Sequence, residues 1–139
     1  MFNRIIVAID GSEHSNRALS YARELAECFK AILWLVHAYP QTSDLRSYDQ
    51  FEKLIARRKQ AGQSILDEAR KILGKINFEI REELLEGPEA EAILSVAQIQ
   101  KIDLILLGTR GLGSLEGMLL GSVSRKVTHH ASCPVMLVR

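Results

Sequence analysis

A glycine-rich segment is the part of this sequence best suited to hold an anion. Five glycines lie from Gly108 through Gly121, and the segment runs on into Ser122-Val123-Ser124. Phosphate binding requires backbone N–H groups that an anion can approach without obstruction by side chains, preferably at a helix N-terminus, where the partial positive charge favours the ligand. The segment offers such amides and two hydroxyl groups, so we treat it as a candidate phosphate site.

A second group with unusual chemistry is Asp10-Gly11-Ser12, which interrupts the apolar run Ile5-Ile6-Val7-Ala8-Ile9. An aspartate directly after a strand often caps the helix that follows. In open α/β sheets, however, ligands bind outside the carboxyl ends of the strands, where the strand order reverses. We therefore favour a binding role for Asp10, with which a capping role is compatible.

Other phosphate-binding motifs are absent from these loops. The Gly117 to Ser122 stretch lacks the lysine of a Walker A loop, and no G-x-G-x-x-G follows the first apolar run. A glycine cluster by itself is also compatible with a simple flexible connection. Glu116 is the one carboxylate near the glycines that is a candidate catalytic base. A surface position in the loop is the better explanation of this residue, so we assign no catalytic residue.

Alternating strand-like and helix-like segments must position these groups. Apolar, β-branched runs predict strands, and apolar residues at helical spacing predict the helices between them. The expected strands are 2–9, 31–39, 78–84, 102–107 and 135–138, and the expected helices begin at Ser12 or Ser15, near Tyr48, at Gly87-Pro88 and at Met118, the last ending at His130. The alternation predicts an α/β fold with a five-stranded parallel sheet and helices on both faces. If the strand order is 3-2-1-4-5, strands 2–9 and 102–107 are neighbours, and the two loops that follow them lie at the point where the order reverses.

Composition limits the protein to a few classes. With 139 residues, of which 47% are hydrophobic and 25% charged, we expect one domain spanning residues 1–139. The 18 Lys+Arg and 17 Asp+Glu nearly cancel, which argues against nucleic-acid binding. The longest apolar run, 31–36, is far shorter than the roughly 20 residues that span a bilayer. We therefore expect a cytoplasmic protein that does not enter a membrane, with Cys28 and Cys133 reduced and structural.

The glycines also carry a family resemblance. Gly108-x-x-Gly111, nine residues and Gly121-Ser122 reproduce the G-2x-G-9x-G-[S/T] pattern of ATP-binding universal stress proteins. Segments 6–12, 35–38 and 131–138 look like the corresponding family segments. The chain thus resembles the universal stress protein family, in its ATP-binding subgroup, over essentially its whole length.

The resemblance implies a pocket for an adenine nucleotide, ATP in the first place, with Mg²⁺ held through the phosphates. Asp10 would reach a ribose hydroxyl or a phosphate-bound cation, and the backbone of Ala38 would read the adenine edge. His37 is expected to be a packed strand residue, and Arg110 either contacts phosphate or is solvated. The residues implied to form the site are Ala8, Ile9, Asp10, Ala38, Leu107, Gly108, Thr109, Arg110, Gly111, Gly121, Ser122, Val123 and Ser124.

The function that the resemblance implies is nucleotide-dependent regulation in a stress response, with at most slow ATP hydrolysis. A nucleotide-independent interaction module is the alternative, although this chain keeps every motif position. An adenylating enzyme of similar architecture would carry a serine- and glycine-rich loop where this chain has residues 10–15. A flavodoxin-like redox protein would also place its phosphate loop after the first strand.

Assembly can be predicted from the last strand. If 135–138 lies at the sheet edge, its residues Val135-Met136-Leu137-Val138 are all apolar, and only Pro134 and Arg139 beside them would disfavour pairing with another chain. Such edges are usually paired or covered. We expect a homodimer joined through strand 134–138, and the resemblance points the same way.

Overall fold

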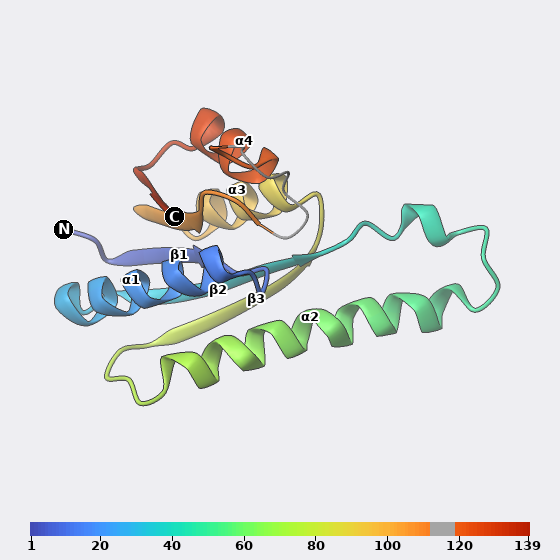
Figure 1. The fold of residues 1–139 in the computed structure, drawn as a ribbon, viewed down its shortest axis with the longest axis horizontal. Helices are drawn as coiled ribbons and strands as arrows, with labels where there is room; N and C mark the ends of the chain where they lie inside the picture. Colours follow the sequence, from blue (N-terminus) through green and yellow to red (C-terminus); the bar gives the residue numbers. More distant parts are fainter. Residues whose placement is uncertain (112–118) are drawn as a thin grey trace.

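The computed structural model describes residues 1–111 and 119–139. Its strands form one parallel sheet in the order β3-β2-β1-β4-β5, with α1 and α2 on one face and α3 and α4 on the other (Figure 1). This confirms the predicted α/β fold and strand order. The strands are β1 Arg4–Ala8, β2 Ile32–Tyr39, β3 Ile80–Glu86, β4 Leu104–Gly108 and β5 Val135–Val138; the helices are α1 Glu13–Phe29, α2 Phe51–Leu73, α3 Glu89–Ile99 and α4 Ser122–His130, with a 3₁₀ turn η1 Ser43–Leu45.

The side chains of the central strands alternate between two cores, which is why their sequences are apolar without interruption. On the α1 and α2 face the buried strand residues are Ile5, Val7, Leu33, Leu35, Leu104 and Leu106. On the α3 and α4 face they are Ile6, Trp34, Val36, Ile105 and Leu107. The sheet is therefore the middle layer of three, and its carboxyl edge is left for loops.

The last helix begins later than its apolar pattern predicts. Residues 119–121 are not helical, and Gly121 stands before the helix in extended backbone, φ −77° and ψ 172°. The predicted start at Met118 lies outside the described residues. The N–H of Gly121 donates to the carbonyl of Thr109 at 2.7 Å, so this residue is tied to the end of β4 instead of joining the helix.

Gly62 lies inside α2, where glycine weakens a helix by roughly 1 kcal/mol relative to alanine. The helix is nevertheless continuous through it. A Cβ at this position would lie 2.7 Å from Leu84 Cδ1 and 3.1 Å from His37 Cδ2. The missing side chain thus allows α2 to approach β2 and β3 closely at one end of the sheet.

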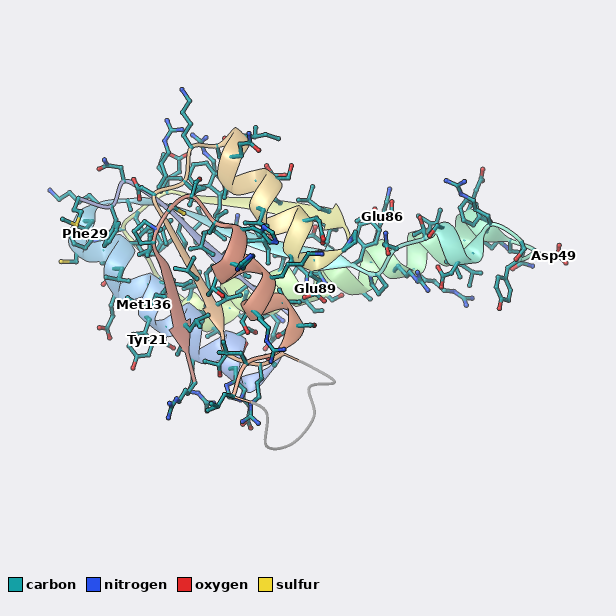
Figure 2. The ribbon with its side chains drawn as sticks, turned by 90° about the horizontal axis from the view of Figure 1, so that it is seen from above. Tyr21, Phe29, Asp49, Glu86, Glu89 and Met136 are labelled. Atoms are coloured by element: carbon teal, nitrogen blue, oxygen red, sulfur yellow. The ribbon has the colours of Figure 1, made fainter. Side chains whose placement is uncertain are left out.

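The connection from β2 to α2 projects beyond the three layers. Figures 1 and 2 both show η1 and the first turns of α2 extending away from the sheet, with Asp49 near the tip. Arg58 of α2 holds the two sides of this arm together, because its Nη1 donates to the carbonyls of Pro40 and Gln41 and it pairs with Asp44 at 3.2 Å.

Among the described residues, no helix has the length and apolar character needed to traverse a membrane.

The central strands should dominate stability. Ile105 of β4 is completely buried, whereas Ile99 at the end of α3 is 71% exposed. We expect Ile105→Ala to lower the free energy of unfolding by about 2–5 kcal/mol through lost burial and a residual cavity, and Ile99→Ala to change it by about 0.5 kcal/mol or less. Urea unfolding followed by circular dichroism measures both, and equal losses would contradict the assignment of the core.

Candidate functional site

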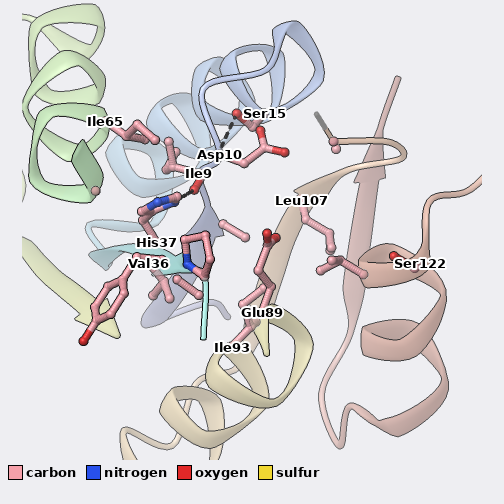
Figure 3. Close-up of a pocket in the computed structure, with 18 of the residues that line it drawn as sticks. Ile9, Asp10, Ser15, Val36, His37, Ile65, Glu89, Ile93, Leu107 and Ser122 are labelled. Atoms are coloured by element: carbon pink, nitrogen blue, oxygen red, sulfur yellow. Dashed lines mark hydrogen bonds between the residues drawn. The ribbon is translucent and has the colours of Figure 1, made fainter. Parts of the chain in front are cut away.

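A cavity of about 480 Å³ opens at the carboxyl ends of β1, β2 and β4. Its walls come from these strand ends, the start of α3, the middle of α2 and the start of α4 (Figure 3). The volume lies within the range of about 300–1,000 Å³ that is typical of small-molecule sites. The strand order brings this about, because β1 and β4 are neighbours and their outgoing chains turn to opposite faces of the sheet.

Most of the predicted site residues line this cavity. Thr109, Gly121 and Ser124 are not among the residues that line its described part. Those that do line it are Ala8, Ile9, Asp10, Ala38, Leu107, Gly108, Arg110, Gly111, Ser122 and Val123. The two loops singled out from the sequence thus meet in one pocket, although they are about a hundred residues apart in the chain.

Thr109 and Ser124 support the pocket wall from behind. The carbonyl of Thr109 accepts the N–H of Gly121 and the hydroxyl of Ser124, both at 2.7 Å. The hydroxyl of Ser124 also lies 3.1 Å from the carbonyl of Gly121, and its side chain is 2% exposed. The described contacts of this hydroxyl therefore go to the backbone, where they fix the start of α4 against the end of β4.

The N-terminus of α4 consequently faces the cavity. Ser122 is the first helical residue, and it lines the pocket together with Val123. Gly121 precedes the helix without a capping side chain. The first-turn N–H groups and the positive end of the helix dipole are therefore directed at the pocket, an arrangement that favours an anion.

Gly108 allows α1 to pack tightly against the end of β4. A Cβ on Gly108 would lie 2.6 Å from the Cβ of His14 and 2.9 Å from its backbone carbonyl carbon. The His14 ring is surrounded by the loop and its own helix: Nδ1 is 3.5 Å from Thr109 Oγ1 and 3.4 Å from Arg17 Nη2, and Nε2 is 3.5 Å from Arg110 Nη2. Gly108 is thus required by contacts within the chain itself, whatever ligand approaches it.

Asp10 organises the turn that leaves β1. Its Oδ1 accepts the N–H of Ser12 at 2.9 Å, and a side chain on Gly111 would collide with its Oδ2. The N-cap of α1 is Ser12, whose hydroxyl accepts the N–H of Ser15 at 3.2 Å. Helix capping therefore falls to Ser12, and the Asp10 carboxylate stands on the pocket wall next to Gly111.

His37 is a buried strand residue, as predicted, and it also forms part of the cavity wall. Its Nδ1 lies 2.6 Å from the carbonyl of Ile9, for which a ring N–H at Nδ1 is the donor. The N–H of Ile9 in turn donates to the carbonyl of Val36 at 2.8 Å. These bonds keep β1 and β2 paired to their carboxyl ends, next to Ala38.

Two charged residues of the pocket were missed by sequence reasoning. Arg58 comes from α2, and no local pattern distinguishes it from its solvated neighbours. Glu89 is the first residue of α3, immediately after Gly87-Pro88, and a carboxylate following a strand was an available signal. Glu89 is open to solvent on one side, yet the pocket walls remove part of its hydration, which raises its pKa above the usual range, and the Asp10 charge adds to this effect.

Glu116, considered above as a base, lies outside the described residues. Within 1–111 and 119–139, no three His, Cys, Asp or Glu side chains are grouped as a metal site would require. The described pocket holds a helix N-terminus, two carboxylates, two guanidinium groups and apolar walls.

Comparison with known proteins shows which family shares this sequence and fold. Residues 1–139 match the universal stress protein family. A universal stress protein of Thermus aquaticus is 43% identical over 139 residues, 100% of both chains. This chain belongs to the universal stress protein family. The structure of hypothetical protein MJ0577 is similar to this one with a TM-score of 0.88 at 22% sequence identity, and the match covers 99% of this chain and 96% of that chain. The structure of a universal stress protein in complex with cAMP is similar with a TM-score of 0.73 at 26% identity, and the match covers 99% of this chain and 97% of that chain.

In this universal stress protein the close contact at Gly108 should be needed for the stability of the fold, independently of any ligand. We expect Gly108→Ala to lower the free energy of unfolding by about 1–3 kcal/mol, because the atoms it meets belong to the stem and backbone of His14 and cannot swing away. Ser122→Ala, on the exposed part of the same wall, should change stability by about 0.5 kcal/mol or less. Urea unfolding without ligand makes the comparison; an unchanged Gly108→Ala variant would show that the approach of α1 is looser than described.

Proposed function

We propose that this universal stress protein binds an adenine nucleotide, ATP in the first place, in the cavity between the ends of β1 and β4. The observation that carries the proposal is that the N-terminus of α4 at Ser122 opens into the same cavity as Asp10 and the end of β2. A relative at 26% identity is described in complex with cAMP, which supports an adenine nucleotide as the ligand class.

The phosphates would lie over the start of α4. The first-turn amides, the Ser122 hydroxyl and the positive helix end all favour an anion there. Arg110 lines the same side of the cavity and would add a bidentate contact. The backbone of Gly111, next to Asp10, lets this loop approach the ligand closely.

The base would lie at the other end of the cavity. Ala38, near the end of β2, is 6% exposed and lines the pocket, so its backbone is the polar group available to an adenine edge. Ile9, Val36 and Ile65 give this end apolar walls that suit a flat aromatic ring. Asp10 stands between the two ends, where a ribose hydroxyl would donate to its carboxylate.

A magnesium ion would accompany the phosphates. Asp10 and Glu89 present carboxylate oxygens to the cavity, the ligand type that Mg²⁺ prefers, and two such groups together with phosphate oxygens and water make a normal coordination shell. The ion would neutralise charge on the phosphates. We assign no catalytic residue, and any hydrolysis would be slow, so nucleotide occupancy itself is the regulatory state of a cytoplasmic, single-domain stress protein.

Ser122→Glu tests the phosphate site without endangering the fold. The helix dipole stabilises a carboxylate in the first turn of α4, so the variant should fold. The same carboxylate would occupy the position proposed for phosphate. By isothermal titration of nucleotide-stripped protein with ATP and Mg²⁺, we expect micromolar binding by the wild type and at least about tenfold weaker binding by Ser122→Glu. Ser95→Glu on the exposed side of α3 is the control of equal charge and should bind as the wild type does.

A wild type that binds no adenine nucleotide would refute the proposal and favour the nucleotide-independent interaction module. Equal losses in Ser122→Glu and Ser95→Glu would instead show that added negative charge acts at long range. GTP in place of ATP checks the base: binding through the backbone at Ala38 should favour adenine over guanine.

We also propose that two copies pair through β5. The carbonyl of Pro134 accepts the N–H of Ile105 on β4, and the carbonyl of Val138 accepts the N–H of Thr109 just after β4. By the alternation of a parallel ladder, the backbone groups of Val135 and Leu137 therefore point to the open edge. Figure 2 shows Met136 on this strand at the side of the sheet. The side chains of 135–137 are only partly buried within one chain.

Size-exclusion chromatography with light scattering tests the pairing. We expect a mass twice the 15.6 kDa of one chain for the wild type at micromolar concentration. Leu137→Lys places a charge on the edge strand, at a side chain that packs partly against the α3 and α4 core, and should shift the protein to the monomer. A retained circular dichroism spectrum is required to show that the variant still folds. A wild type that elutes as a monomer would contradict the pairing.

A further inference from the structure

Glu89 occupies a position in the cavity that no motif of the sequence explains. It begins α3, and Figure 3 shows its side chain directed into the pocket, between Asp10 on one side and Leu107 and Ser122 on the other. It therefore lies between the two parts of the site to which we assigned the sugar and the phosphates. The helix dipole accounts for a carboxylate at the start of α3, but it does not require that this side chain point into the cavity.

The electrostatic surroundings of Glu89 are negative. The pKa of its carboxyl is raised first by lost hydration and then by the carboxylate of Asp10. The other charged or titratable groups that line the cavity are His37 and Tyr39 on β2, Arg58 on α2 and Arg110 after β4. Among the described contacts, Arg58 is held by Pro40, Gln41 and Asp44, and Arg110 lies beside His14. These contacts hold both guanidinium groups beside other residues, and Asp10 is the charged group that acts on the Glu89 carboxyl.

This arrangement affects a nucleotide unevenly. The base and the sugar carry no charge and can accept or donate hydrogen bonds beside a carboxylate. The phosphates carry several negative charges, and like charges in a partly desolvated cavity repel strongly. A divalent cation between the phosphates and the carboxylates turns the same repulsion into attraction.

We propose that Glu89 is a specificity-determining residue, which makes the pocket reject a metal-free polyphosphate and accept the same nucleotide with a divalent cation. This inference rests on the proposed function and adds to it the charge state of the ligand. Asp10 contributes to the same field, but it also fixes the turn after β1 through Ser12. Glu89 can therefore be altered with less effect on the local structure.

Glu89→Gln keeps the shape of the side chain and removes its charge. We compare the dissociation constant of ATP in excess EDTA with that of ATP in excess Mg²⁺, both by isothermal titration at pH 7.5. The wild type should bind the magnesium complex at least about tenfold more tightly than metal-free ATP, and Glu89→Gln should reduce this ratio at least about threefold, chiefly by binding metal-free ATP better. Adenosine, which has no phosphate, should bind wild type and variant within about twofold.

Glu52→Gln is the matched control. Glu52 lies in the first turn of α2, is exposed and is not among the cavity residues, so the substitution removes the same charge from a helix start elsewhere. It should leave the magnesium ratio unchanged. An equal reduction in Glu52→Gln would assign the effect to net charge, and an unchanged ratio in Glu89→Gln would remove Glu89 from the selection; either result overturns the inference.

The remaining outcomes are also decisive. If Glu89→Gln weakens adenosine as much as ATP, Glu89 is a general contact of the pocket and the inference is wrong, although the proposed function stands. If the wild type binds neither adenosine nor ATP, the proposed function fails and the inference with it.

Discussion

The backbone of Thr109 is the junction on which the site depends. Its N–H donates to the carbonyl of Val138 at 2.8 Å, and its carbonyl receives the N–H of Gly121 and the hydroxyl of Ser124. One peptide segment therefore connects β4, β5 and α4. A helix start aimed at a cavity is useful only if it is held there, and buried backbone hydrogen bonds of this kind are costly to leave unmade. The position of the anion-favouring amides thus follows from the pairing at the end of the sheet.

How far the sequence predicts this structure differs between the fold and the site. Uninterrupted apolar runs can bury both faces only in a covered parallel sheet, so the strands were predictable from their own residues. The strand order does not follow from these runs, and it was favoured by the position of the glycines after residue 107. Given that order, the two loops that meet in the cavity were predictable, because the order places β1 beside β4. Arg58 and Glu89 were not found, since their places depend on where α2 crosses β2 and on how α3 begins. Ser124 looks in the sequence like a second phosphate hydroxyl, and its bond to Thr109 is apparent only in three dimensions.

The pocket combines groups of both charges. The carboxylates of Asp10 and Glu89, the guanidinium groups of Arg58 and Arg110, and the start of α4 all line it. Apolar residues from both cores of the protein close the remaining sides, among them Ile65 from the α2 face and Ile93 from the α3 face. The cavity therefore lies between the two layers of helices at the carboxyl edge of the sheet, and a change in the packing of either layer changes its shape. Gly62 shows how little slack there is, because α2 lies against Leu84 and His37 without room for a methyl group.

Because Gly108 is needed for its contact with His14, the presence of a glycine at this position does not by itself indicate that a protein binds a ligand. A related protein that binds no nucleotide would still need a glycine at the position of Gly108, because α1 packs there too closely for a side chain. A side chain on Gly111 would meet the carboxylate end of Asp10 instead, so that contact constrains the side chain of Asp10 and not the path of a helix. Ser122, on the exposed start of α4, has no such packing constraint. In a family member that has lost its ligand, we therefore expect the residue at the position of Ser122 to change before the glycine at the position of Gly108. A substitution at Ser122 is thus the more informative sign that binding has been lost.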